Sequence, residues 1–163
     1  MVFSKSLFSS KSSDWKTPMW LFKYLEEKFG KFDLDPATTE DNPLKTPHFF
    51  TKKDNGLCRK WFGRVFLNPP YGSEIVYWVR KSFLETKKLR NAEIVVCLLP
   101  SRTDTKWWHN YVMRSDEVYF IKGRLKFEGA DSSAPFPSVI VVFKKGEVKI
   151  PKFFSLDISK IRR

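Results

Sequence analysis

Six consecutive apolar residues run from Ile94 to Leu99 and are followed by Pro100. A strand with one face in water alternates polar and apolar side chains, so an unbroken apolar run predicts a strand that is covered on both faces. Such strands lie in the middle of largely parallel sheets that carry helices on either side. A shorter strand of the same kind is predicted from Val65 to Leu67, where Pro69 and Pro70 soon follow.

Helical patterns alternate with these strands. Thr17 and Pro18 predict a helix start, with Thr17 able to cap, and apolar residues at helical spacing continue up to Gly30. An amphipathic helix is predicted over 75–89 and a further helix over 103–113. Short strands are expected at 32–35, 117–121 and 138–143. The alternation predicts an α/β three-layer domain with a mostly parallel sheet.

The length of 163 residues suits one domain. We expect a flexible basic arm at 1–13, a single domain at 14–145 and a basic extension at 146–163.

The net charge of +12 favours a polyanionic partner such as nucleic acid or an anionic membrane surface. No apolar stretch reaches the roughly 18–20 residues of a membrane span, which indicates an intracellular protein. Cys58 and Cys97 lie far apart, so neither a disulfide nor a metal site is predicted.

The tetrapeptide Asn68-Pro69-Pro70-Tyr71 directly follows the shorter strand. Its prolines remove two backbone donors and fix φ, which leaves the Pro69 carbonyl free and rigidly aimed. The exocyclic amine of adenine is a poor nucleophile because its lone pair is delocalised into the ring. Acceptors on Asn68 and Pro69 would bind both amine hydrogens and draw the nitrogen toward a nucleophilic geometry. Tyr71 would provide a stacking face for a base rotated out of the duplex.

Methyl transfer from a sulfonium is a direct displacement, so positioning is sufficient and no catalytic His or Cys is expected. A simpler interpretation is that Pro69 and Pro70 only end the strand and that Tyr71 packs against it. The strand residues RVFL before the tetrapeptide, and Gly72 after it, favour a functional site.

Several segments, taken in order, resemble the phage DNA N-6-adenine methyltransferase family, the Dam-like enzymes. They span most of residues 14–143 and are Asp14-Trp15 with Thr17-Pro18, FGKFDLDPA, DNGL, RVFLNPPYG, LLPSRTDTKWWH, GRLKF and APFPSVIVVF. The resemblance implies a class I, Rossmann-like methyltransferase fold with a late antiparallel strand. It also implies S-adenosylmethionine as methyl donor and adenine in double-stranded DNA as acceptor.

The same resemblance implies a set of cofactor-binding residues: Thr17, Pro18, Asp35, Pro36, Ala37, Asp54, Gly56, Leu57 and Asn68. Asp35 is expected near the methionine amino group, Thr17 near the methionine end, and Asp54 at the adenosine portion. No glycine-rich loop follows Asp35, although the small Ala37 permits close backbone approach. Without the resemblance, Asp33 and Asp35 are also explained as a turn and helix-cap pair.

The candidate DNA-binding residues are Arg102, Lys106, Trp107, Arg124 and Lys126. Arg102 and Lys106 would bind phosphates, and Trp107 or Trp108 would wedge or stack DNA. The alternative for this segment is a strand-helix turn with an N-capping Thr or Asp and a core Trp. The loop 123–137 is equally explained as an ordinary exposed hairpin, and the basic end as a solvated tail.

Asn-Pro-Pro-Tyr also suits other planar amines, so cytosine N4, an RNA base or a protein glutamine is an alternative acceptor. A catalytically inactive nucleic-acid-binding relative is the second alternative. The charge of +12 favours nucleic acid over protein. We further expect a GATC-like target, a monomer or homodimer, and action in the cytoplasm of the host cell.

Overall fold

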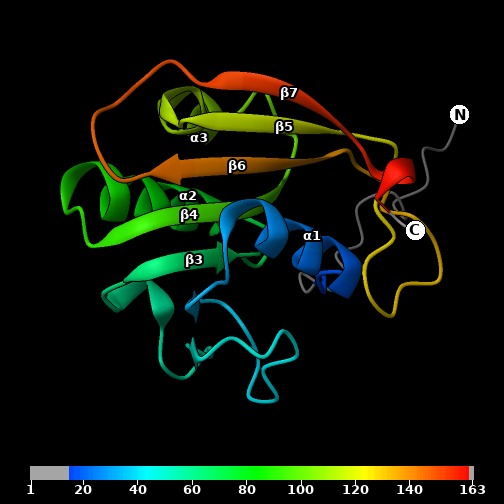
Figure 1. Cartoon of the computed structure of the whole chain (residues 1–163), viewed down its shortest axis with the longest axis horizontal. Coiled ribbons are helices and arrows are strands. Elements are labelled where there is room, and N and C mark those ends of the chain that lie inside the picture. Colours follow the sequence, from blue (N-terminus) through cyan, green and yellow to red (C-terminus); the bar gives the residue numbers. More distant parts are fainter. Residues whose placement is uncertain (1–14, 162–163) are drawn as a thin grey trace, which may run out of the picture.

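The computed structural model describes residues 15–161. The predicted arm at 1–13 lies outside this range. One sheet of seven strands runs through the molecule in the order β2-β1-β3-β4-β6-β5-β7 (Figure 1). The strands are β1 (Leu34–Asp35), β2 (His48–Phe49), β3 (Gly63–Leu67), β4 (Ala92–Pro100), β5 (Glu117–Lys122), β6 (Ser138–Lys144) and β7 (Lys152–Asp157).

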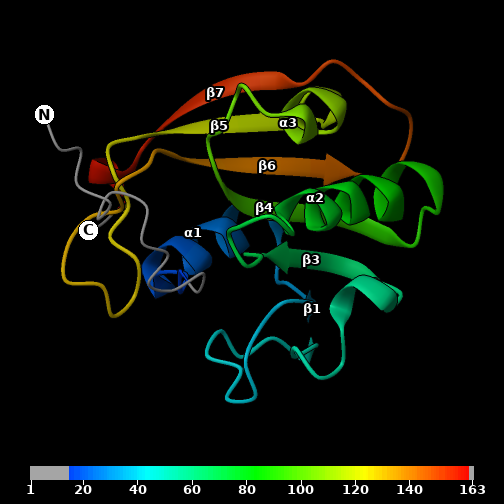
Figure 2. The same ribbon diagram turned by 180° about the vertical axis from the view of Figure 1, so that it is seen from behind.

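Helices cover both faces of the sheet. Opposite views show α1 (Met19–Phe29) over one face and α2 (Ile75–Phe83) and α3 (Lys106–Asn110) over the other (Figures 1 and 2). The buried stripe of α1 includes Phe22, whose ring packs edge-on against Phe66 of β3 at 5.2 Å between centroids. The predicted three-layer α/β architecture is therefore confirmed, and the sheet is Rossmann-like.

The apolar run that ends at Pro100 forms β4, in the middle of the sheet. It pairs in parallel with β3 and antiparallel with β6, and residues 94–99 are buried. The predictions of a doubly covered central strand and of a late antiparallel strand are both confirmed. Within residues 15–161, no helix is long and apolar enough to cross a membrane.

The two helices predicted over 75–89 and 103–113 are shorter than expected. The second, α3, covers only Lys106–Asn110. α2 ends at Phe83 and continues as a π-helical segment from Leu84 to Lys88. There the Thr86 hydroxyl donates to the Ser82 carbonyl at 2.9 Å, and Leu89 N–H reaches back five residues to the carbonyl of Leu84. Single 3-10 turns lie at Gly56–Cys58, Val112–Arg114 and Ile158–Lys160.

The C-terminal segment differs from the prediction of an extension. Lys152–Asp157 forms β7, which pairs in parallel with β5 along six residues. Phe154 stacks on Tyr119 at 4.7 Å and Phe153 on Phe120 at 6.0 Å. The expectation of a solvated tail was therefore wrong for these residues, because their backbone pairs with β5, although Phe153 and Phe154 remain 49% and 40% exposed.

Candidate active site

The order of strands reverses at β1. The chain passes from β1 to its neighbour β2 on one side and then to β3 on the other. In open parallel sheets such a reversal leaves a crevice at the carboxyl ends of the two strands, because the loops that follow them diverge. Asp35 is the last residue of β1, and Asn68 follows β3 immediately. The sheet therefore brings the two main sequence motifs to one edge.

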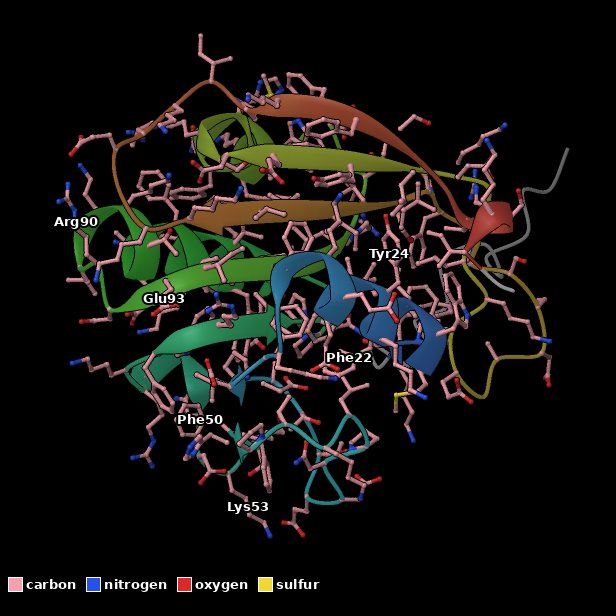
Figure 3. All side chains as sticks on the ribbon, viewed as in Figure 1. Phe22, Tyr24, Phe50, Lys53, Arg90 and Glu93 are labelled. Carbon is pink, nitrogen blue, oxygen red and sulfur yellow. The ribbon has the colours of Figure 1, made fainter. Side chains whose placement is uncertain are left out.

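Two further segments reach this edge. β4 ends at Pro100, which pairs with Ser138 at the start of β6, so the loop 123–137 and the turn after Pro100 lie at the same end of the sheet. Arg90 and Glu93, near the start of β4, lie at the opposite end (Figure 3). The crevice is thus bordered by segments that are distant in the sequence.

The side-chain amide of Asn68 has a defined orientation. Its Nδ2 donates to the Trp15 carbonyl at 2.5 Å and to the Thr17 hydroxyl at 2.9 Å. Because a carbonyl oxygen can only accept, the nitrogen must face Trp15 and the oxygen must point elsewhere. Asn68 Oδ1 is buried and has no hydrogen-bond partner among the described residues. An unpaired buried acceptor costs about 1–3 kcal/mol, so it marks a place where a donor is expected.

The next residue along the chain, Pro69, carries a second acceptor. Pro69 is a buried residue, and among residues 15–161 no backbone or side-chain donor reaches its carbonyl. Pro70, the next residue, has no N–H to donate, as the sequence predicted. Consecutive residues, Asn68 and Pro69, therefore each carry an acceptor without a partner in the described chain, and two such acceptors suit a group with two hydrogens on one nitrogen.

Tyr71 is more enclosed than a stacking platform would require. The residue is 9% exposed, its hydroxyl donates to the Leu98 carbonyl at 3.0 Å, and burial raises the pKa of Tyr71 well above the usual value. Phe127 and Phe136 of the loop 123–137 pack edge-to-face with it at 6.3 and 5.7 Å. The hydroxyl end of Tyr71 thus packs against the sheet, as the simpler interpretation of the tetrapeptide proposed. Pro70 and Tyr71 also line a small hollow of about 230 Å³ with residues 72–74.

Asp35 is a buried carboxyl group at the end of β1. It is 4% exposed, and its Oδ1 accepts a hydrogen bond from Ala37 N–H at 3.1 Å. Burial raises its pKa to about 7, although hydrogen bonds from Ala37 and from the Thr38 side chain partly oppose the rise. No lysine, arginine or histidine of the described chain pairs with it. The site therefore contains a carboxyl group suited to a cation that comes from outside the chain.

The segment DNGL packs against the loop after β1. A methyl group on Gly56 would collide with the Pro36 carbonyl and approach the Trp78 ring at 3.3 Å. Asp54 Oδ2 accepts from both the N–H and the hydroxyl of Thr51 at 2.8 Å, and these bonds lower its pKa. Asp54 thus stabilises its own turn, while Gly56 allows the two predicted cofactor segments to touch.

Thr17 has a different contact from the one predicted. The residue before α1 is Pro18, which makes no side-chain cap, and the buried Thr17 hydroxyl accepts from Asn68 instead. The prediction that Thr17 caps the helix was therefore wrong. Trp15, which received no role from the sequence, holds Asn68 through its carbonyl and packs on Phe127 and Phe136 at 5.2 Å. Its only sequence signal was its place in a segment that resembles the family.

The candidate DNA-binding residues fall into two groups. Arg102, Lys106, Arg124 and Lys126 are exposed around the carboxyl edge of the sheet. Trp107 is 6% exposed, and Thr105 caps α3 by accepting from Trp108 N–H, so this turn matches the alternative of a capped helix with core Trp residues. The buried Trp107 therefore does not lie on the exposed surface with these four basic residues.

The strand order is that of a Rossmann-like methyltransferase fold. The two candidate site residues, Asp35 and Asn68, lie at the carboxyl ends of β1 and β3, where such a fold binds its ligands. A family model described as DNA N-6-adenine-methyltransferase (Dam) matches residues 5–155. The chain belongs to this family of adenine-specific DNA methyltransferases.

Two phage relatives are similar to the chain. The DNA N-6-adenine-methyltransferase of Haemophilus phage HP1 (strain HP1c1) is 37% identical over 125 residues, which cover 73% of this chain and 70% of the relative. The DNA N-6-adenine-methyltransferase of Escherichia phage T1 is 30% identical over 136 residues, which cover 82% of this chain and 54% of the relative. The chain therefore spans about half the length of the T1 protein.

Proposed function

We propose that this protein transfers the methyl group of S-adenosylmethionine to the exocyclic amine of adenine in double-stranded DNA. The observation that carries the proposal is the pair of unpartnered acceptors, Asn68 Oδ1 and the Pro69 carbonyl, at the end of β3. Both hydrogens of an amino group would satisfy them. Binding these hydrogens localises the nitrogen lone pair and turns it toward a methyl donor.

The residues around Asp35 fit S-adenosylmethionine. Its α-ammonium group would neutralise the buried carboxylate, which has no cationic partner among the described side chains. Pro36 and Ala37 would border the bound molecule. Because Gly56 has no side chain, nothing collides there with the Pro36 carbonyl. When bound, the cofactor would supply a sulfonium methyl group: the amine nitrogen bonds to the methyl carbon, the carbon–sulfur bond breaks with the neutral thioether as leaving group, and the amine loses one proton to solvent.

Adenine must leave the duplex to reach these acceptors. Since Asn68 Oδ1 is closed to solvent and Tyr71 packs against Phe127 and Phe136, a base can enter only if a covering segment moves. The loop 123–137 carries both phenylalanines together with the exposed Arg124 and Lys126. We propose that contact of this loop with DNA phosphates accompanies its displacement, and that Tyr71 then offers part of its ring to the base.

The family and the phage relatives favour adenine over cytosine N4, an RNA base or a protein glutamine. We further propose a GATC-like recognition site. A phage-type DNA methyltransferase would act in the cytoplasm of the host cell, where its substrate lies.

The proposal predicts labelled N6-methyladenine after the protein is incubated with methyl-labelled S-adenosylmethionine and unmethylated duplex DNA. Nucleoside analysis identifies the product, and a panel of duplexes with and without GATC tests the site. Asn68→Ala should lower turnover by roughly a hundredfold or more, because it removes an acceptor that acts on the reacting nitrogen. Its affinity for the cofactor should stay within a few fold of the original, which calorimetry can measure.

Asp35→Asn serves as the matched variant, since it should weaken cofactor binding first. Label in N4-methylcytosine would move the acceptor to cytosine. Full turnover by Asn68→Ala would contradict the role of the amide, and cofactor binding without transfer to any nucleic acid would support an inactive relative.

A further inference from the structure

We propose that Thr17 is a positioning residue for the methyl-transfer reaction, because its hydroxyl acts with the Trp15 carbonyl, which can only accept, to hold the Asn68 amide in its observed orientation. The inference rests on the proposed role of Asn68. Resemblance to the family implied a cofactor contact for Thr17, but the geometry gives its hydroxyl another partner, the Asn68 Nδ2 at 2.9 Å.

The orientation of an asparagine amide is not fixed by its backbone. Rotation by half a turn exchanges oxygen and nitrogen at little intrinsic cost, and would put an NH₂ group where the reaction needs an acceptor. In this site the Trp15 carbonyl and the Thr17 hydroxyl lie together on the nitrogen side, at 2.5 and 2.9 Å from Nδ2. A rotated amide would bring two carbonyl-type oxygens against each other at Trp15. We call the Trp15 carbonyl and the Thr17 hydroxyl the bracket of Asn68. Because the bracket holds Nδ2, Oδ1 stays on the side where the reaction needs an acceptor.

The bracket is itself held in place. Trp15 packs on Phe127 and Phe136 of the loop 123–137, each at 5.2 Å between ring centroids. The Lys16 carbonyl accepts from Glu128 N–H at 2.9 Å, and Thr17 is 8% exposed. The segment 15–17 thus lies between the loop and the strand end, where its position determines which atoms Asn68 can contact.

Thr17→Val tests this assignment, since valine keeps the shape of threonine but cannot accept a hydrogen bond. Loss of one of the two acceptors should lower the turnover number for adenine by roughly three- to tenfold, while the dissociation constant for S-adenosylmethionine changes less than twofold. Thr17→Ser keeps the hydroxyl and should restore most of the rate. If Thr17→Val bound S-adenosylmethionine more weakly but kept its turnover number, the proposal would be overturned and Thr17 would be a cofactor-binding residue. Unchanged turnover and unchanged cofactor affinity would overturn it as well.

A second measurement does not depend on activity. The side-chain NH₂ signals of Asn68, assigned by their loss in Asn68→Ala, should exchange with solvent more slowly in the original protein and in Thr17→Ser than in Thr17→Val. Equal exchange in all three would overturn the bracket. Slower exchange in a protein that transfers no methyl group to adenine would support the bracket while the proposed function fails.

Discussion

The buried carboxyl group of Asp35 lowers the stability of the free protein and at the same time suits a positively charged ligand. A carboxylate that is nearly closed to water and has no cationic partner in the described chain destabilises the folded protein at neutral pH. The same feature favours a ligand that brings a positive charge. We interpret this cost as one that ligand binding offsets.

Replacement of Asp35 by asparagine should therefore stabilise the free protein in a pH-dependent way. The folded-state pKa of about 7 lies above the unfolded value of 3.8, so the contribution of Asp35 to stability is fully present below pH 3.8 and is lost as pH rises through 7. Asparagine cannot ionise. The advantage of Asp35→Asn should thus grow between about pH 4 and pH 7 and level off above, at most near 4 kcal/mol. Urea unfolding at a series of pH values measures it.

Asp157 is the control for this experiment. Hydrogen bonds from Ser159 and Lys122 lower its pKa to about 2, so its contribution is present above pH 3.8 and is lost as pH falls through 2. Asp157→Asn should consequently be less stable than the original protein at neutral pH. A gain for Asp35→Asn that does not change with pH would mean that ionisation of Asp35 is not its source.

At the level of elements, sequence reasoning succeeded where one local signal dominated. The apolar run of β4 and the apolar spacing of α1 required no knowledge of their neighbours. β7 was missed because its apolar residues become informative only when Tyr119 and Phe120 are known to lie beside them. The π-helical end of α2 was missed for a similar reason, since the Thr86 hydroxyl bond that accompanies it depends on the local geometry.

The candidate site shows the same division. Asp35 and Asn68 could be found from their place after predicted strands, and the sheet puts those strands side by side. The contacts of Asn68 with Trp15 and Thr17 join residues more than 50 positions apart, for which no spacing rule exists. The enclosure of Tyr71 by Phe127 and Phe136 depends likewise on how a long loop folds back.

The close approach of two loops gives a prediction at this level. Gly56→Ala places a methyl group against the Pro36 carbonyl, a backbone atom that can move only with the loop after β1. Such overpacking should lower the free energy of unfolding by about 1–3 kcal/mol and also weaken S-adenosylmethionine binding. Urea unfolding and calorimetry measure the two effects.

Gly129→Ala provides the comparison, because Gly129 has open space around it and a φ of 75°. Alanine there should cost about 1–2 kcal/mol through its backbone alone and leave cofactor binding unchanged. If Gly56→Ala bound the cofactor as well as the original protein, contact between the two loops would have no part in the cofactor site.

At the level of the whole molecule, the net charge of +12 attracts DNA from any direction, so it cannot by itself say which face binds. The fold places exposed basic residues at both ends of the sheet. Arg124 and Lys126 are exposed on the loop 123–137 at the end that carries Asn68, whereas Lys60 and Lys88 are exposed before the starts of β3 and β4. The two pairs carry equal charge and differ in place.

Removal of Arg124 and Lys126 should reduce the salt dependence of DNA binding more than removal of Lys60 and Lys88. Each phosphate contact contributes about −0.9 to the slope of log K against log salt concentration, so the double variant Arg124→Ala/Lys126→Ala should lose roughly 2 units of slope if both side chains contact phosphates. Lys60→Ala/Lys88→Ala, with the same change in net charge, should leave the slope within about half a unit. Fluorescence anisotropy with a labelled duplex between low and moderate salt gives both slopes. Equal losses would show that DNA responds to total charge, and a larger loss for the Lys60 and Lys88 pair would place the DNA at the opposite end of the sheet from Asn68.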